Sequence, residues 1–182
     1  MPRNRVEFSL RRARKVIVVG MPHEVPEMTS AIDQKLQALG IELPTPSVPG
    51  ANYVPTVRTG NLLLITGQLS QWNGERRFVG KLGREFSVEE GQQAARLCAL
   101  NLLAHAREAM GGNLDNIVRC LRVAGYVNGT PEFTGQSQVI NGASDLFVQV
   151  FGEAGRHTRM AIGVASLPYG VAVEVEALLE VS

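Results

Sequence analysis

One arginine and two glutamates stand inside two runs that otherwise read as buried strands, residues 158–166 and 171–181. In the first run Arg159 alternates with three residues that have little or no side chain: Ala161, Gly163 and Ala165. In the second run the odd positions are apolar, and Glu174 and Glu176 take even positions. Because successive side chains of a strand point to opposite faces, the glutamates should face away from the helices that cover the odd positions. We expect the three charges to share that side of the sheet, with open space beside the arginine.

Two interpretations of this charged group remain open from spacing alone. A guanidinium can hold a carboxylate through two parallel hydrogen bonds, so Arg159 could grip a small anionic ligand. Glu174 could then position a water molecule or move a proton. In the alternative interpretation Arg159 forms a structural ion pair with a glutamate across a hairpin, which contributes little stability when it is exposed.

Four further residues could line a ligand site, although each also has an ordinary structural explanation. Thr66 ends an apolar run and Gly67 follows it, so the pair could form a ligand cradle or a simple turn. Tyr53 could be a pocket wall or a core residue. Asn141 lies in a helical pattern, where asparagine is a poor helix former, and this unfavourable placement suggests a role for its side chain.

The elements that must position these residues follow from hydrophobic periodicity and from cap signals. Helices are predicted at residues 30–40, 87–110 and 136–151, and strands at 53–58, 62–66, 117–127, 158–166 and 171–181, the last two joined by a turn at 167–170. Residues 67–83 are polar and rich in glycine, which predicts a loop with at most a short strand near residue 78. This pattern predicts an α+β sandwich, with two helices packed on one face of a mixed β-sheet. The other face is too apolar to meet water, so we expect self-association.

The chain has 182 residues, and its charges are unevenly distributed. Residues 1–20 contain six basic residues and one acidic residue, whereas the remainder is mildly acidic, which argues against a nucleic-acid-binding surface. We expect residues 1–28 to be a flexible basic arm or an extension from an upstream start codon, and residues 29–182 to form one domain. The apolar run at residues 16–21 is too short to span a membrane. The histidines and cysteines show no metal-ligand spacing, so no metal site is predicted.

Four segments of the chain together resemble the YjgF/RidA family, the Rid proteins, whose older name is L-PSP endoribonuclease. They are Tyr53 with LLLITGQL at residues 62–69, VINGASDLF at 139–147, the stretch 159–168, and VEVEA at 173–177. The ending that combines the arginine, Leu-Pro and VEVEA is the most specific of them. The helix predicted at 30–40 is similar to the longer branch of the family, and residues 1–28 have no counterpart in it.

The resemblance implies a chorismate-mutase-like α+β fold and a homotrimer with clefts between its subunits. The two cysteines, Cys98 and Cys120, form no Cys-x-x-Cys pair, so we expect them to be reduced, buried thiols of a cytoplasmic protein. The resemblance further implies a reaction that needs no cofactor, the hydrolysis of reactive enamines and imines, such as 2-aminoacrylate, to 2-keto acids and ammonia. A non-catalytic protein with the same pocket would bind or sense a small carboxylate, and this alternative stays open. The ribonuclease activity of the older name is a third hypothesis, which the acidic body of the chain disfavours.

The resemblance also implies roles for particular residues. Arg159 would grip the substrate carboxylate, and Glu174 would act on the catalytic water. The substrate-binding positions of the family fall on five residues, the last of which is often a cysteine in the family: Tyr53, Thr66, Gly67, Asn141 and Ala161. Ser70 stands where a proline is usual and Gly163 where a glutamate is frequent, which affects the choice of substrate more than the class of reaction. Glu176 has no implied role beyond that of a structural partner at a subunit interface.

Overall fold

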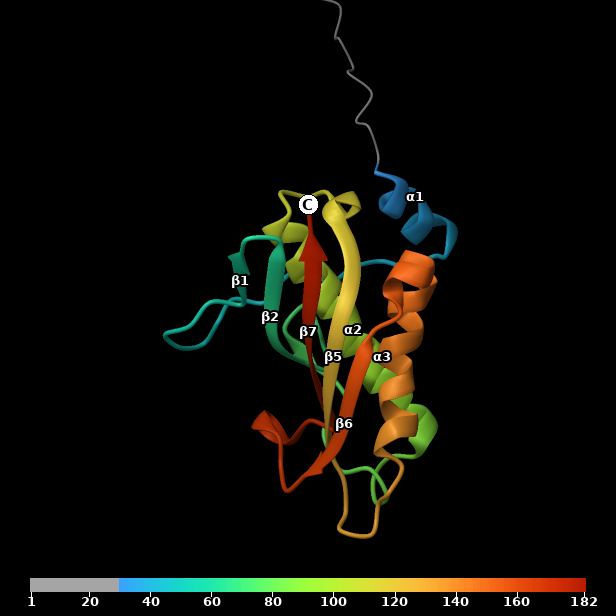
Figure 1. The fold of residues 1–182 in the computed structure, drawn as a ribbon. Coiled ribbons are helices and arrows are strands. Elements are labelled where there is room, and N and C mark those ends of the chain that lie inside the picture. The colour runs from blue at the N-terminus through green and yellow to red at the C-terminus, as the bar shows by residue number, and fades with distance from the viewer. Residues whose placement is uncertain (1–29) are drawn as a thin grey trace, which may run out of the picture.

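The structure is a computed structural model, and it describes residues 30–182. Its main feature is a five-stranded sheet in the order β1-β2-β7-β5-β6 (Figure 1). The strands are β1 Thr56–Thr59, β2 Leu62–Leu69, β5 Ile117–Asn128, β6 Thr158–Val164 and β7 Val173–Val181. Neighbouring strands are antiparallel except for β5 and β6, which are parallel, so the sheet is mixed as predicted.

Two long helices, α2 (Val88–Ala109) and α3 (Gln136–Phe151), pack against each other and cover one face of this sheet (Figure 1). A capping box begins α2, as the Ser-Val-Glu-Glu stretch at residues 87–90 predicts: Ser87 and Glu90 each accept a hydrogen bond from the backbone of the other. The apolar stripe of α3 that periodicity predicts is fully buried except for Phe151, which is half-buried against the core: Val139, Ala143, Leu146, Phe147, Val150 and Phe151. The α+β sandwich with both helices on one face is therefore confirmed.

A short helix, α1 (Ala31–Ala38), precedes the sheet in the chain. Ser30 caps it as predicted, because its hydroxyl accepts a hydrogen bond from the backbone N–H of Asp33 at 3.0 Å. Leu36 of this helix packs into the core. The expected basic arm at residues 1–28 lies outside the described residues, and the domain boundary beside it stays a prediction.

The segment predicted as a loop with one short strand contains more pairing than its sequence suggested. A two-stranded ribbon forms from β3 (Gln71–Trp72) and β4 (Glu75–Arg76). Beyond it, Val79 forms an isolated antiparallel bridge with Val171, at the entry to β7. The ribbon is thus fastened beside the point where the chain enters the central strand of the sheet.

The prediction that the last two strands form a hairpin is wrong. Strand β5 lies between β6 and β7 in the sheet, and residues 168–170 form the 3-10 turn η3 (Pro168–Gly170) on the way from one to the other. The physical reason is the helix α3, which connects β5 to β6. Parallel neighbours need such a crossover connection, and it places β6 at the edge of the sheet beside its own helix.

The face of the sheet opposite the helices keeps apolar side chains exposed in a single copy of the chain. Leu64 lies opposite Leu178 on this open face, and Ile162 lies opposite Tyr126. Leu64 is 46% exposed and Ile162 is 41% exposed. Covering apolar surface of this kind is favourable, so the open face is where we expect a second copy to pack.

Candidate active site

Arg159 lies on β6, and residues of α3 hold its guanidinium. Its Nη1 donates hydrogen bonds to Oδ1 of Asn141 at 2.8 Å and to Oγ of Ser144 at 3.3 Å. Ala161, the next residue on the same side of the strand, packs against the core. Three of the predicted site residues are therefore neighbours. Arg159 itself is exposed, and within residues 30–182 its Nε and Nη2 form no hydrogen bond, so they can bind an anion.

The expectation that Arg159 shares a side of the sheet with the glutamates is wrong. Arg159 lies opposite Val123 of β5, and Val123 lies opposite Ala177 of β7, so all three are on the helix-covered face. Glu174 lies opposite Tyr126, on the open face. No ion pair joins Arg159 to a glutamate within residues 30–182, and the structural ion pair across a hairpin is therefore wrong as well.

The small residues of β6 face α3 and allow this helix to pack closely. They do not form the open space beside the arginine that the sequence predicted. A β-carbon added at Gly163 would lie 3.0 Å from Nε2 of Gln136, which is on α3. The larger Ile162 points the other way and stays exposed. β6 lies at the edge of the sheet, and its larger side chains lie on the open face. The alternation of large and small residues shows that the strand has two different faces, but it does not show which of them the helices cover.

Glu174 forms a second group with Thr66 and Gly67. The register between β2 and β7 shifts between Ile65 and Gln68, so a bulge lies at the two residues between them. The carboxylate of Glu174 occupies the space that a side chain at residue 67 would need, since a β-carbon there would overlap its Oε1. Glycine at this position therefore lets the carboxylate lie directly against the backbone of β2.

A hollow of about 240 Å³ opens beside this bulge. Tyr53, Thr66 and Gly67 line it, together with residues 47–50 of the preceding loop. Its volume is below the ~300–1,000 Å³ of sites for drug-sized ligands, so it suits a molecule with few carbon atoms. The predicted site residues thus fall into two groups, one around Glu174 and this hollow, and one around Arg159.

The environment of Glu174 changes its proton affinity. Partial burial raises the pKa of Glu174 above its ordinary value, and the negative charge of Glu176 raises it further. Burial raises the pKa of Tyr126 too, and again Glu176 adds to the effect. A carboxyl group whose pKa is raised exchanges protons more readily near neutral pH, so Glu176 acts on this site through its charge.

A chain of hydrogen bonds behind Arg159 was not predicted from the sequence. Nδ1 of His157 lies 2.6 Å from the carbonyl oxygen of Gly155, and its Nε2 lies 3.0 Å from Oγ of Ser144. Because a carbonyl oxygen only accepts, Nδ1 carries the proton, and Nε2 of the neutral imidazole accepts a hydrogen bond from Ser144. The hydroxyl oxygen of Ser144 is thereby turned to accept from Arg159, which positions the guanidinium.

Acidification is expected to destabilise the protein through His157. Burial lowers its pKa, the bond to Gly155 opposes this, and the charge of Arg159 lowers the pKa further. The unfolded chain therefore binds the proton more tightly than the folded protein does. The stability that the neutral imidazole contributes is complete above the unfolded pKa of about 6.5, and it is lost as the pH falls through the lower folded pKa.

The measurement is Tm as a function of pH for the wild type and for His157→Gln, whose side chain can accept from Ser144 but does not titrate in this range. The wild type should lose Tm as the pH falls below about 6.5, and the variant should lose less. The loss that remains is expected from His105, whose pKa burial also lowers. Two superimposable pH profiles would contradict the neutral form assigned to His157.

Comparisons with known proteins give the family of the chain. Residues 33–180 match the family model whose description reads "YjgF/chorismate_mutase-like, putative endoribonuclease". The chain belongs to the YjgF family. Protein TCP17 of Trypanosoma cruzi is 48% identical over 148 residues, which are 81% of this chain and 92% of that protein.

Solved structures share the fold of this chain. Atu1372 from Agrobacterium tumefaciens, a protein of unknown function, is 44% identical with a TM-score of 0.78. The match covers 83% of this chain and 92% of that one. RidA from an Antarctic Psychrobacter is 27% identical with a TM-score of 0.51, over 75% of this chain and 94% of that one. The resemblance read from four short segments is thereby confirmed for the family and the fold.

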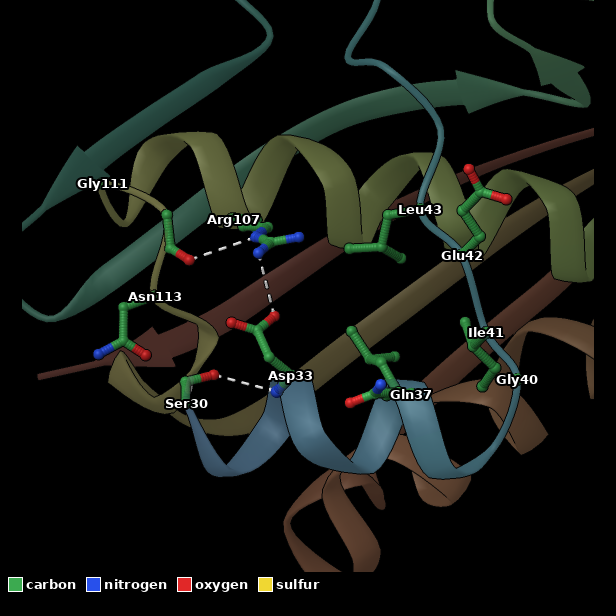
Figure 2. Close-up of a pocket in the computed structure, with 12 residues that line it drawn as sticks. Ser30, Asp33, Gln37, Gly40, Ile41, Glu42, Leu43, Arg107, Gly111 and Asn113 are labelled. Carbon is green, nitrogen blue, oxygen red and sulfur yellow. Dashed lines mark hydrogen bonds and ion pairs between the residues drawn. The ribbon is translucent and has the colours of Figure 1, made fainter. Parts of the chain in front are cut away.

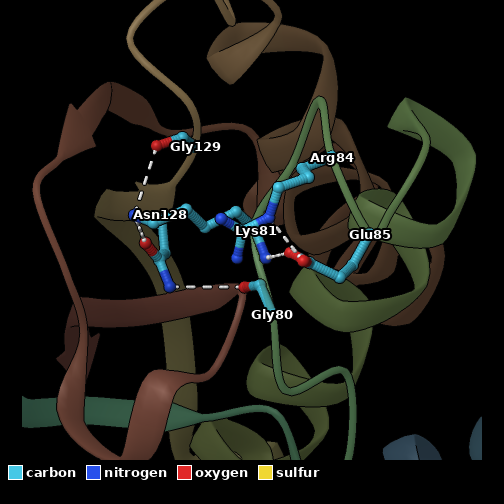
Figure 3. Close-up of polar contacts among 6 residues, drawn as sticks. All are labelled: Gly80, Lys81, Arg84, Glu85, Asn128 and Gly129. Atoms are coloured by element: carbon cyan, nitrogen blue, oxygen red, sulfur yellow. Dashed lines mark hydrogen bonds and ion pairs between the residues drawn. The ribbon is translucent and has the colours of Figure 1, made fainter.

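A lysine of this YjgF-family chain fastens the end of the strand that carries Arg159, and no sequence motif indicated this role. Figure 3 shows Lys81 reaching the side chain of Asn128 and the backbone of Gly129. Its Nζ donates to Oδ1 of Asn128 at 2.5 Å, to the carbonyl of Ala165 at 2.8 Å and to that of Gly129 at 3.4 Å. All three donors of the ammonium have acceptors, so it ties together the ends of β5 and β6.

A larger hollow lies away from both groups of predicted site residues. It measures about 830 Å³ and lies between α1 and the C-terminal end of α2 (Figure 2). Arg107, which lines it, pairs with Asp33 at 3.2 Å and donates to the carbonyl of Gly112 at 3.2 Å. Because Asp33 already neutralises the charge of Arg107, the described residues that line this hollow include no unpaired arginine that could bind a carboxylate.

Residues 30–182 contain no group of three or more His, Cys, Asp or Glu side chains that could hold a metal ion. In the same range no helix has the length and apolar character needed to cross a membrane.

Proposed function

We propose that this YjgF-family protein hydrolyses reactive enamines and imines of small 2-imino acids to 2-keto acids and ammonia. We further propose that it acts as a homotrimer whose active sites lie between subunits. The observation that carries the proposal is the division of the site residues. A cation suited to a carboxylate, Arg159, lies on one face of the sheet, and a carboxylate beside a small hollow, Glu174, lies on the other.

A composite site follows from this division. Glu174 is on β7 and Arg159 is two strands away on β6, which is about 9–10 Å across the sheet, and their side chains leave from opposite faces. Within one copy they cannot converge on a ligand of a few atoms. In a cyclic assembly each copy presents different surfaces to its two neighbours, so Arg159 of one copy can meet Glu174 of the next. The apolar open face supplies a surface for such packing.

The proposed mechanism gives each residue a modest task. Arg159 holds the substrate carboxylate through two charge-assisted hydrogen bonds, while Asn141 and Ser144 hold the guanidinium. An enamine first gains a proton on carbon and becomes the imine. Water then attacks the imine carbon, and Glu174 or the substrate's own carboxylate accepts a proton from that water.

The second half of the reaction releases the nitrogen. The proton passes to the nitrogen and gives a carbinolamine. The hydroxyl proton of this intermediate then also moves to the nitrogen, the C–N bond breaks with its electron pair on nitrogen, and the C=O bond forms. One imine and one water thus give one keto acid and one ammonia, and no electron acceptor is needed. Such imines already hydrolyse in water, so an acceleration of about 10²–10⁴-fold from positioning and one acid–base group is sufficient.

The test couples the protein to an amino-acid oxidase or a dehydratase that releases the imine, and it follows formation of the keto acid. We expect the keto acid to form faster than without the protein. Imines from several amino acids that all hydrolyse at the uncatalysed rate would overturn the proposal. In that case, thermal stabilisation by 2-keto acids without turnover would instead support a binding or sensing protein.

The ribonuclease hypothesis has a separate outcome. RNA cleavage that follows the protein through purification and persists in the Arg159→Ala variant would support it, because the proposed imine chemistry depends on that arginine. Loss of the RNA cleavage during purification would assign it to a contaminant.

A further inference from the structure

The hollow beside Thr66 and Gly67 contains an arginine that the proposed mechanism does not use. Arg76 lies on β4 and lines this hollow. Of the lining residues that the structure describes, it alone has a charged side chain. The part of the predicted substrate pocket that one copy of the chain forms therefore carries a positive charge, from Arg76 on β4. The carboxylate of Glu174 lies beside this part of the pocket, against Gly67.

An aromatic ring holds the side chain of Arg76 in place. Its Cζ lies 3.5 Å from the centroid of the Tyr169 ring, well within the ~6 Å of a cation–π contact. Tyr169 also lines the hollow, and its φ of 58° lies in the left-handed region that residues with side chains seldom adopt. A backbone conformation of this kind persists where the surrounding structure supports it, so the ring has a fixed position from which to orient the guanidinium.

The charge of Arg76 has no acidic partner within residues 30–182. Its two neighbours, Glu75 and Arg77, pair with each other at 3.7 Å and thus satisfy their charges without it. Because successive residues of a strand point to opposite faces, Arg76 is directed away from Glu75. A guanidinium that stacks on a ring by its flat face keeps the N–H donors of its edge available, and these match the two oxygens of a carboxylate.

We propose that Arg76, positioned by Tyr169, is a second anion subsite and that the preferred substrates are imines of amino dicarboxylic acids. This inference rests on the proposed imine hydrolysis. Arg159 of a neighbouring copy holds the carboxylate next to the imine carbon, and Arg76 holds the carboxylate at the far end of the substrate. A hollow of about 240 Å³ has room for a dicarboxylate with four or five carbon atoms.

The activity test compares imines generated from aspartate or glutamate with imines generated from alanine or 2-aminobutyrate. We expect the protein to accelerate the dicarboxylate imines about tenfold more. Arg76→Met keeps the apolar stem over the Tyr169 ring and removes the charge. The variant should abolish the preference for dicarboxylate imines, so that the ratio of the dicarboxylate rate to the monocarboxylate rate falls about tenfold. The matched control Arg77→Met, which removes a neighbouring charge outside the hollow, should retain the preference.

A binding test separates this inference from the proposed function. Tm is measured with 2-oxoglutarate and with 2-oxobutyrate at equal concentrations, for the wild type and both variants. We expect greater stabilisation by 2-oxoglutarate, lost in Arg76→Met and kept in Arg77→Met. If no imine is accelerated but 2-oxoglutarate stabilises the protein more than 2-oxobutyrate does, the proposed reaction is wrong and the proposed subsite is supported. If imines are accelerated without any dicarboxylate preference, or if Arg76→Met keeps the preference, the subsite is overturned and the reaction stands.

Discussion

Arg159→Ala is expected to reduce the acceleration of imine hydrolysis by at least about 100-fold, because it removes the only group proposed to hold the substrate carboxylate next to the reacting carbon. Glu174→Gln should cause a loss of similar size, because the amide keeps the shape of the side chain but does not accept a proton. Arg159→Lys keeps the charge but lacks the forked donors, so an intermediate rate is expected. The measurement is kcat/KM in the oxidase-coupled assay.

The control for these losses is an arginine that lies close by in sequence but outside the site. Arg156 pairs with Glu153 at 3.0 Å on the surface, and both side chains are largely exposed. Arg156→Ala should therefore keep the wild-type rate. An Arg159→Ala variant that is folded and still hydrolyses imines at the wild-type rate would exclude the proposed role of Arg159.

Mixing the two inactive variants tests whether the site is shared between copies. In trimers assembled by co-expression of Arg159→Ala and Glu174→Gln chains, a site is intact when one chain supplies the arginine and its neighbour supplies the glutamate. Random assembly of equal amounts makes about a quarter of the sites intact, so about a quarter of the wild-type rate should return. If both residues served one site within a single chain, no mixture would recover activity.

The long helices were predicted well because periodicity and caps specify them locally. The predicted range 136–151 coincides with α3, since its apolar stripe reports burial against the sheet directly. The capping box likewise gave the start of α2 at Ser87. Each of these signals lies within one element, so no knowledge of distant partners was needed.

The facing of β6 could not be predicted in the same way. It depends on pairing with β5, whose residue Val123 fixes the side on which Arg159 emerges. Strand order is a non-local property, and the short separation of β6 and β7 along the chain favoured a hairpin that does not form. The resemblance to the family nevertheless selected the right neighbours, since Arg159 meets Asn141 and Glu174 meets Gly67.

The residues that the sequence analysis missed act through contacts between distant segments. Ser144 and His157 meet across α3 and the start of β6. Ser144 lies within the segment 139–147 that resembles the family, but the resemblance implied no role for it, and His157 lies outside all four segments. Lys81 reaches three oxygens on two other segments. Arg76 acquires its orientation from a tyrosine 93 positions later in the chain, which no local pattern could indicate.

Gly142→Ala is expected to be the most destabilising single substitution next to the site. Gly142 lies on α3 where that helix crosses α2, and a β-carbon there would overlap the backbone carbonyl oxygen of Gln92. Alanine gains about 1 kcal/mol of helix propensity over glycine, but a main-chain carbonyl inside a helix cannot rotate away. The two helices would have to separate, and overpacking of this kind costs about 1–3 kcal/mol or more.

The expected result is a Tm lowered by several degrees, since about 1 kcal/mol corresponds to roughly 2–4 °C for a chain of this size. The rate of imine hydrolysis should fall as well, because Asn141 moves with the helix and its hydrogen bond to Arg159 is weakened or lost. Gly50→Ala is the matched control, because a β-carbon at that loop position meets nothing within 4 Å. If both variants melted at the wild-type temperature, the close approach of α2 and α3 at Gly142 would be refuted, and with it the rigid support that this helix contact gives to Asn141.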